Sequence, residues 1–159
     1  MFCTGTYERS MDGKRRILLP KTVRYYLHED KYLFLTPGTD GCLEIHNEAS
    51  LGELAARSQN SRVAYQSRAT FSRIFFAQSQ RCEIDASHRL RVAGSLSDLV
   101  ELESPVVIVG VGGHWEIWNR SVWHRYLQQN QTDFDHHAKI VRGGGDRTEP
   151  LEEVVNKPR

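Results

Sequence analysis

Asp12-Gly13-Lys14-Arg15-Arg16 and Asp85-Ala86-Ser87-His88-Arg89 are two copies of one pattern, in which an acid precedes an arginine by four residues. The copies lie 73 positions apart. Each is followed by a short run built on apolar residues, Ile17-Leu18-Leu19 in the first copy and Leu90-Arg91-Val92 in the second. Two similar segments at a fixed offset are the sequence signature of an internal repeat.

The similarity continues downstream of both copies. Leu43-Glu44-Ile45-His46-Asn47 matches Trp115-Glu116-Ile117-Trp118-Asn119 at an offset of 72, so one deletion in the preceding turn explains the change. Glycines occupy both of those turns, joined by Pro37 in the first, as tight reversals require. A segment with helical spacing of apolar residues follows each match. The chain is therefore a duplicated module.

Alternation of side-chain character and turn residues predicts an α+β fold that is mainly β. The expected strands are 2–10, 16–19, 32–36 and 42–46, then 74–84, 90–92, 105–110 and 115–118. The expected helices are 21–27, 48–57, 62–72, 95–100 and 120–129, with Asn47 as the N-cap of the second. These elements divide the chain into a first module (1–58), a helical connector (59–73), a second module (74–129) and a polar tail (130–159). We expect the tail to be disordered, apart from a possible helical turn near 151–155.

Composition excludes several classes of protein. The chain has 159 residues, is 39% hydrophobic and carries a net charge of +1. Its three cysteines are widely spaced and form no CxxC pair, which indicates reduced thiols in a cytosol rather than a disulfide framework or a zinc knuckle. The chain begins without a signal-peptide pattern, and its apolar runs are too short to span a membrane. We expect a cytoplasmic protein without a cofactor.

Positive charge gathers around the first copy of the pattern. The segment from Glu8 to Arg24 holds six cations against two acids, a net charge of +4. Arginine grips phosphate with two parallel hydrogen bonds, and counterion release drives binding to a polyanion. The candidate DNA-binding residues are Lys14, Arg15, Arg16, Lys21 and Arg24, with Arg89 from the second copy, whose surroundings net only +1.

Asp12 and Asp85 are expected to organise their turns. Each carboxylate can accept backbone N–H groups of its own turn and pair with the arginine four residues on, which leaves the other cations projecting outward. The alternative interpretation is that both acid–arginine pairs only clip the turns and bind nothing.

Other candidate sites have weaker support. Gly143-Gly144-Gly145 lacks the flanking residues of a phosphate-binding loop, so a flexible linker is the better interpretation. His136 and His137 could bind a metal with nearby aspartates, but a solvated surface is preferred and no metal site is assigned. Trp115, Trp118 and Trp123 could stack on bases, although packing in a core or subunit interface is favoured. No nucleophile motif is present, so neither a catalytic residue nor a small-molecule substrate is assigned and the chain is not expected to be an enzyme.

Taken together, these motifs resemble the MraZ family. The residues that carry the resemblance are Phe2, Gly5, Asp12, Arg16, Pro20, Arg24, Gly41-Cys42-Leu43, Arg73-Ile74-Phe75-Phe76-Ala77, Glu83-Ile84-Asp85, Arg89, Glu116-Ile117-Trp118 and Trp123. The resemblance implies a tandem pair of swapped-hairpin, AbrB-like (double-split) β-barrel halves with short helices. It also implies a nucleoid-associated regulator of the division and cell-wall gene cluster that binds short direct repeats in promoter DNA as a ring-shaped homo-oligomer. The Asp12–Arg16 and Asp85–Arg89 turns would contact the DNA.

This chain departs from the family pattern at several positions. Arg15 and His88 stand where the family usually has glycine, so both must tolerate the backbone angle that glycine serves. Ala93-Gly94 and Ser97 replace a proline and an arginine after the second turn, which predicts a smaller share of DNA binding for the second module.

The sequence is compatible with more than one class of function. The leading hypothesis is a DNA-binding regulator, and the alternative is an AbrB-like protein-interaction or antitoxin-type module. A small hydrolase would need an acid–base pocket that the sequence does not reveal. Trp118 and Phe76 look surplus to one small core, which favours a homo-oligomer because monomers rarely leave large apolar patches in water.

Overall fold

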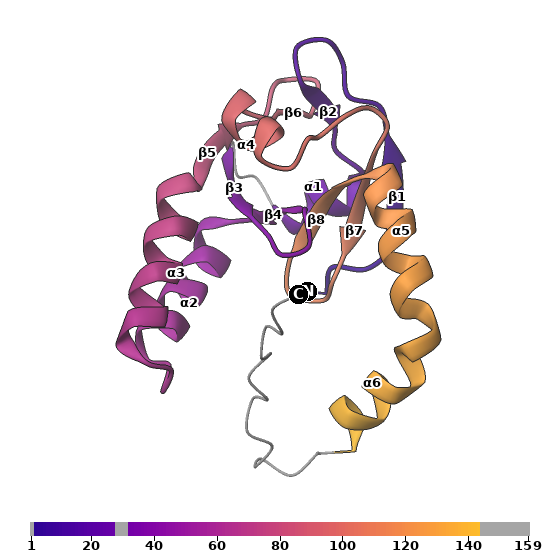
Figure 1. The fold of residues 1–159 in the computed structure, drawn as a ribbon. Coiled ribbons are helices and arrows are strands. Elements are labelled where there is room, and N and C mark those ends of the chain that lie inside the picture. The colour runs from indigo at the N-terminus through magenta and orange to yellow at the C-terminus, as the bar shows by residue number, and fades with distance from the viewer. Residues whose placement is uncertain (1, 28–31, 144–159) are drawn as a thin grey trace, which may run out of the picture. The chain divides into compact units, whose positions relative to one another are not determined.

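The computed structural model describes residues 2–27 and 32–143 (Figure 1). The strands are β1 (Thr6–Arg9), β2 (Arg16–Leu18), β3 (Tyr32–Pro37), β4 (Leu43–His46), β5 (Gln80–Glu83), β6 (Arg89–Arg91), β7 (Val106–Gly110) and β8 (Trp115–Asn119). The helices are α1 (Lys21–Tyr26), α2 (Glu48–Gln59), α3 (Tyr65–Gln78), α4 (Gly94–Leu99), α5 (Arg120–Asn130) and α6 (Phe134–Arg142), with a 3-10 turn, η1 (Gln131–Asp133). The expected fold class, α+β and mainly β with short helices, is confirmed.

The order of elements repeats along the chain. Strand, strand, short helix, two strands and a helix run from β1 to α2, and the same order runs from β5 to α5. The larger sheet has the order β1-β7-β8-β4-β3-β5, all antiparallel, so equivalent strands of the two repeats occupy equivalent places on either side of the β8–β4 pair. The smaller sheet pairs β2 with its equivalent, β6. The duplication seen in the sequence is therefore built into the sheets.

Strands are exchanged between the repeats. β1 of the first repeat pairs with β7 of the second, and β5 of the second pairs with β3 of the first. This exchange is what a swapped-hairpin arrangement requires, and both copies lie in one compact unit, Met1–His124. The module boundaries at residues 58 and 73 remain predictions.

One hydrophobic core serves both repeats. Its fully buried members include the equivalent pairs Ile17 and Leu90, and Ile45 and Ile117, so each repeat fills the same layer from opposite sides. Burial of this apolar surface is the main stabilising contribution to the fold. Neither repeat has its full set of strand partners alone.

The connector differs from expectation. Helix α3 continues to Gln78, so the predicted strand over 74–84 is wrong as far as Gln78 and begins only at Gln80. Aromatic and β-branched residues there favoured a strand, but Phe75 is buried on one face of the helix while Ile74 remains exposed. Helix α2 matches expectation, and Asn47 caps it by accepting a 2.8 Å hydrogen bond from Ser50 N–H.

The predicted disordered tail is wrong over its first part. Helix α5 extends to Asn130, and η1 and α6 follow as far as Arg142. Helix α6 is amphipathic, with Phe134, Ile140 and Val141 as its large apolar residues. The segment as a whole is polar, so its composition alone did not indicate this helix. The predicted helical turn near 151–155 lies outside the described residues.

The tryptophan packing is only partly as expected. Trp115 and Trp118 are buried on opposite faces of β8. Trp115 belongs to the hydrophobic core, as expected, and Trp118 packs against Trp123 outside that core, with ring centroids 5.3 Å apart. Trp118 is already buried within a single chain, so the argument for an oligomer that rested on its needing cover is wrong. Phe76 is half-buried on α3.

Within the part of the chain that the structure describes, no helix has the length and apolar character needed to cross a membrane.

Candidate nucleic-acid interface

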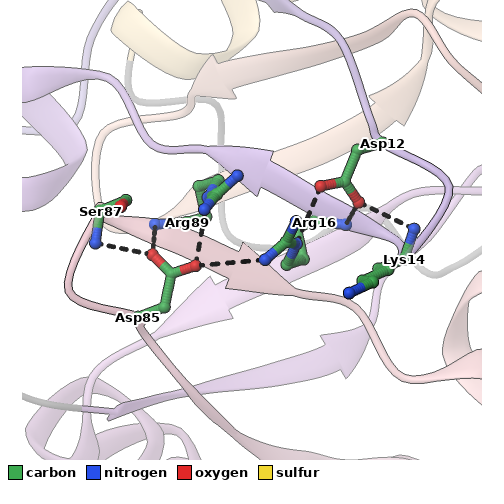
Figure 2. Close-up of polar contacts among 6 residues, drawn as sticks. All are labelled: Asp12, Lys14, Arg16, Asp85, Ser87 and Arg89. Carbon is green, nitrogen blue, oxygen red and sulfur yellow. Dashed lines mark hydrogen bonds and ion pairs between the residues drawn. The ribbon is translucent and has the colours of Figure 1, made fainter.

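The first turn is held by the carboxylate of Asp12 (Figure 2). Its Oδ1 accepts hydrogen bonds from the backbone N–H groups of Lys14 (2.9 Å) and Arg16 (3.0 Å). Its Oδ2 accepts a third from Arg16 Nε at 2.8 Å. The backbone closes the same loop, because Arg15 N–H donates to the Asp12 carbonyl at 2.9 Å. One side chain thus fixes both the turn and the arginine.

The second turn repeats this arrangement atom for atom. Asp85 Oδ1 accepts from the N–H groups of Ser87 and Arg89, both at 2.9 Å, and Oδ2 accepts from Arg89 Nε at 3.1 Å. His88 N–H donates to the Asp85 carbonyl at 2.8 Å. These are the hydrogen bonds that a turn-organising role for Asp12 and Asp85 would use, and the role itself stays a prediction.

The residue before each arginine has a left-handed backbone. Arg15 and His88 both have φ near +58°, which side chains with a Cβ adopt at a cost. These are the two positions at which the family that the sequence resembles usually has glycine. The strain persists because the aspartate and the paired strands determine the backbone on both sides.

Hydrogen bonding keeps both aspartates charged. The pKa of Asp12 lies below its ordinary value chiefly because the Arg16 backbone N–H stabilises the carboxylate, and the Arg89 backbone N–H does the same for Asp85. Partial burial opposes these shifts without reversing them. Each turn therefore holds a fixed negative charge beside its arginine at neutral pH.

The β2–β6 ribbon joins the two turns into one surface. Ile17 pairs with Leu90 on the buried side, which places the neighbouring arginines on the outer side. Across the ribbon, Arg16 Nη1 lies 3.9 Å from Asp85 Oδ2, so the arginine of one turn reaches the acid of the other (Figure 2).

Backbone hydrogen bonds extend this connection beyond the strands. Leu19 N–H donates to the carbonyl of His88 at 3.1 Å, and Val92 N–H donates to that of Arg15 at 2.9 Å. Each turn is therefore attached to the strand that leaves the other turn.

The six predicted DNA-binding side chains differ in their exposure to solvent. Lys14, Arg15 and Lys21 are exposed, and Arg16 and Arg89 are half-buried beside the aspartates. Arg15 lies 3.8 Å from Asp98 of α4, a solvent-exposed pair that offsets part of its charge. Arg24 is half-buried in the last turn of α1 with its Nε enclosed, which leaves it less available than the other five.

The structure adds two arginines that were not assigned from the sequence. Arg91 lies directly opposite Arg16 in the ribbon and is exposed, and Arg81 of β5 stacks its guanidinium 3.9 Å from the centre of the Tyr32 ring. Arg81 and Arg91 line a hollow of about 610 Å³ together with Lys14 and Arg15. Glu83 is the acidic residue in its lining. The alternation Arg89-Leu90-Arg91 was the signal that could have identified Arg91, because alternate residues of a strand share one face.

This arrangement can bind phosphate. Arginine and lysine side chains around an open hollow offer many N–H donors, and the arginines are held in place before any ligand arrives. Asp12 and Asp85 each occupy the Nε of an arginine and so orient the rest of its guanidinium. Pre-organisation of this kind lowers the entropic cost of binding.

Catalytic or metal-binding roles for the other candidates have little structural support. Cys3, Cys42 and Cys82 are buried free thiols, and burial raises the pKa of Cys3 and Cys82 to about 11, which keeps them protonated. His136 and His137 lie exposed on α6, with ring centroids 5.6 Å apart.

Comparisons with known proteins agree on one family. The family model described as "MraZ protein, putative antitoxin-like" matches residues 2–73 and again residues 75–141, one match for each repeat. Proteins named "Transcriptional regulator MraZ" are similar along most of their length. The one from Alkaliphilus oremlandii is 31% identical over 131 residues, covering 82% of this chain and 90% of the relative.

Two further relatives carry the same name. The one from Thermoanaerobacter sp. (strain X514) is 30% identical over 135 residues, covering 85% of this chain and 93% of the relative. The one from Pediococcus pentosaceus is 30% identical over 138 residues, covering 82% and 90%. Two matches to one family model, in register with the repeated turns and strands, establish that the chain belongs to the MraZ family.

Proposed function

We propose that this chain is a non-enzymatic transcriptional regulator that binds double-stranded DNA sequence-specifically through the β2–β6 ribbon and its two aspartate-held turns. The observation that carries the proposal is the ribbon itself, which joins two equivalent turns back to back and lines their outer side with cations. The curated relatives are named transcriptional regulators, which supports the same conclusion.

In this proposal the cationic residues have different roles in DNA recognition. Lys14, Arg15 and Lys21 contact backbone phosphates, which positions the ribbon without reading sequence. Arg16 and Arg89 present guanidinium groups already oriented by the aspartates, and they approach phosphate or base edges. Arg91 and Arg81 extend the same surface. Release of counterions from the DNA supplies most of the affinity.

A single ribbon is small, so several copies must act together. We propose a homo-oligomeric ring whose subunits meet successive direct repeats in the DNA, because fixed spacing makes each later contact intramolecular. Support comes from α3, where Tyr65, Phe71 and Ile74 remain exposed on a single chain. Exposed apolar surface of this kind favours contact between subunits.

The family resemblance supplies the proposed target and place of action. The DNA would be short direct repeats in the promoter of the division and cell-wall gene cluster, and the protein would act in the cytoplasm, associated with the nucleoid. We expect no membrane partner and no small-molecule substrate.

The test is a gel-shift series with DNA from upstream of the protein's own gene, with and without its short repeats, at rising salt. Specific binding that needs the repeats and weakens steeply with salt is expected. Binding that ignores the repeats would contradict sequence specificity. The absence of DNA binding at low salt would contradict the proposal and favour the protein-interaction or antitoxin-type module.

A further inference from the structure

Two glutamates face each other at the centre of the large sheet. Glu44 of β4 and Glu116 of β8 are direct partners in the antiparallel register, so their side chains lie on the same face. Their side chains are only 17% and 15% exposed. Like charges directly opposite each other destabilise a strand pair, and partial burial removes much of the solvent that would screen them. A nearby cation would offset this repulsion.

Each glutamate is already oriented by the residue two positions further along its strand. His46 Nε2 lies 2.8 Å from Glu44 Oε2, and its N–H must donate because a carboxylate only accepts. Trp118 Nε1 donates to Glu116 Oε2, also at 2.8 Å. Both supporting side chains are buried. One oxygen of each carboxylate is thus held, which leaves the Oε1 atoms for another partner.

Those Oε1 atoms converge on one imidazole nitrogen. His114 Nε2 lies 3.8 Å from Glu44 Oε1 and 3.6 Å from Glu116 Oε1, beyond hydrogen-bond length in both cases. This nitrogen is shielded from solvent and has no partner at hydrogen-bond distance within the described residues, although both glutamates lie within ion-pairing distance of it. The His114 ring is fixed by stacking on His46, with centroids 5.1 Å apart and planes 22° from parallel.

We propose that Glu44, His114 and Glu116 bind a divalent transition-metal ion, zinc by its ligand chemistry. The three ligand atoms lie within 4.8 Å of one another. Zinc at its usual bond lengths to nitrogen and oxygen sets tetrahedral ligands about 3.4 Å apart. The two distances from His114 Nε2, 3.8 and 3.6 Å, lie within about 0.4 Å of that value, and the widest pair of ligand atoms would have to close by up to about 1.4 Å. Imidazole with carboxylates is a ligand set that zinc accepts.

The surroundings fit such a site. His46 and Trp118 supply the outer hydrogen bonds that orient metal ligands in proteins. Glu44, His46 and His114 also line a cavity of about 490 Å³, which gives an ion access and leaves room for a water molecule as fourth ligand. Arg57 lines the same cavity and opposes a cation, but two carboxylates outweigh one guanidinium.

The repeat explains why there is one site and not two. The position equivalent to His114 in the first repeat is Cys42, at the same offset of 72 that relates Glu44 to Glu116. Its thiol is turned to the Thr39 carbonyl, to which it donates a hydrogen bond at 3.2 Å. Only the His114 side of the glutamate pair is therefore equipped to bind a metal.

Binding would clamp the two repeats together, because β4 belongs to the first and β8 to the second. The consequence is a metal-dependent stability of the Met1–His124 unit. An ion that binds only the folded state stabilises it in proportion to its occupancy.

The test is titration of the full-length protein, stripped with a chelator, with zinc by calorimetry and with cobalt by visible absorption, alongside thermal melts. We expect one ion per chain, a higher melting temperature with zinc, and cobalt bands of tetrahedral type. His114→Ala should weaken zinc binding by more than about tenfold, and Trp118→Phe, which keeps the ring but loses the N–H donor, by about tenfold. The matched control is His136→Ala with His137→Ala, which removes two exposed histidines and should change nothing.

Glu116→Gln is a second variant, which tests the site even if His114→Ala fails to fold. It removes one carboxylate charge from the site while keeping an oxygen that can accept from Trp118, and zinc should raise its melting temperature less than that of the wild type. The proposal is overturned if zinc does not bind the wild type, if zinc stabilises Glu116→Gln as much as the wild type, or if only the α6 histidine variant loses binding.

Discussion

The two aspartate turns share one hydrogen-bond pattern and differ in the side chains that they present. Asp12 and Asp85 each accept two backbone N–H groups and an arginine Nε, with matching distances. Between acid and arginine, however, the first turn presents Gly-Lys-Arg and the second presents Ala-Ser-His. The turn is therefore a structural device in both repeats, and the first repeat alone adds a full set of cations to it.

Their arginines also differ in what they contact. Arg16 reaches Asp12 and, across the ribbon, Asp85, whereas Arg89 pairs with Asp85 alone among the ion pairs of the described residues. The first-repeat arginine is thus the more firmly held of the two. A duplicated scaffold can keep its geometry in both halves while its binding chemistry becomes unequal.

The largest effect should come from the buried side of the ribbon, where the two repeats are equal. Ile17 and Leu90 are fully buried cross-strand partners, so Ile17→Ala and Leu90→Ala should each lower the free energy of unfolding by about 2–5 kcal/mol. Urea denaturation monitored by circular dichroism gives both values. A loss in only one of the two would show that the repeats do not share the core equally.

The next largest effect should be on DNA binding, where the arginines of the two turns are expected to differ. Arg16→Ala should weaken binding to promoter-repeat DNA by about tenfold or more, and Arg89→Ala by a smaller factor, because Arg16 is more firmly oriented and lies in the more cationic repeat. Fluorescence anisotropy on one DNA fragment measures both dissociation constants. Equal losses of affinity, or a larger loss for Arg89→Ala, would contradict the predicted difference between the two turns.

A smaller effect should appear at the left-handed residues. His88→Gly should raise the free energy of unfolding by about 1 kcal/mol, because glycine adopts a positive φ without the Cβ penalty. Arg15→Gly should gain less, since it also loses the exposed pair with Asp98. Denaturation midpoints compare the two, and His88→Ala is the control that keeps the strain.

The smallest effect concerns pH. Asp12 and Asp85 have lowered pKa values in the folded state, so they contribute stability above the unfolded pKa of about 4 and lose it as the pH falls through their folded values. The Asp12→Asn and Asp85→Asn variants should therefore lose less stability than the wild type on acidification below about pH 4. Thermal melts across that range measure the difference, and parallel curves would contradict the role given to the carboxylates.

Local pattern was enough to predict most elements and the turns. The repeat offset, the turn residues and the cap at Asn47 depend on neighbours in sequence, and they are where they were expected. The identity of the turn-organising aspartates followed from the same local chemistry.

Features that depend on distant neighbours were missed. Helix α3 extends into a segment with strand-like composition, and Phe75 is buried on one face of that helix. Trp118 lies on β8, between β7 and β4, and packs against Trp123 of α5. The facing of Glu44 and Glu116 depends on the register between β4 and β8, which no local pattern specifies.

The central claim is that both turns form one DNA-binding surface, and the salt dependence of binding tests it most directly. Dissociation constants for promoter-repeat DNA should be measured by anisotropy across a salt series for the wild type, for Lys14→Ala with Arg16→Ala, and for Arg89→Ala with Arg91→Ala. We predict a steep salt dependence for the wild type, with a slope reduced by about one for each cation removed from either turn. Affinity independent of salt, or wild-type slopes in both double variants, would contradict the account.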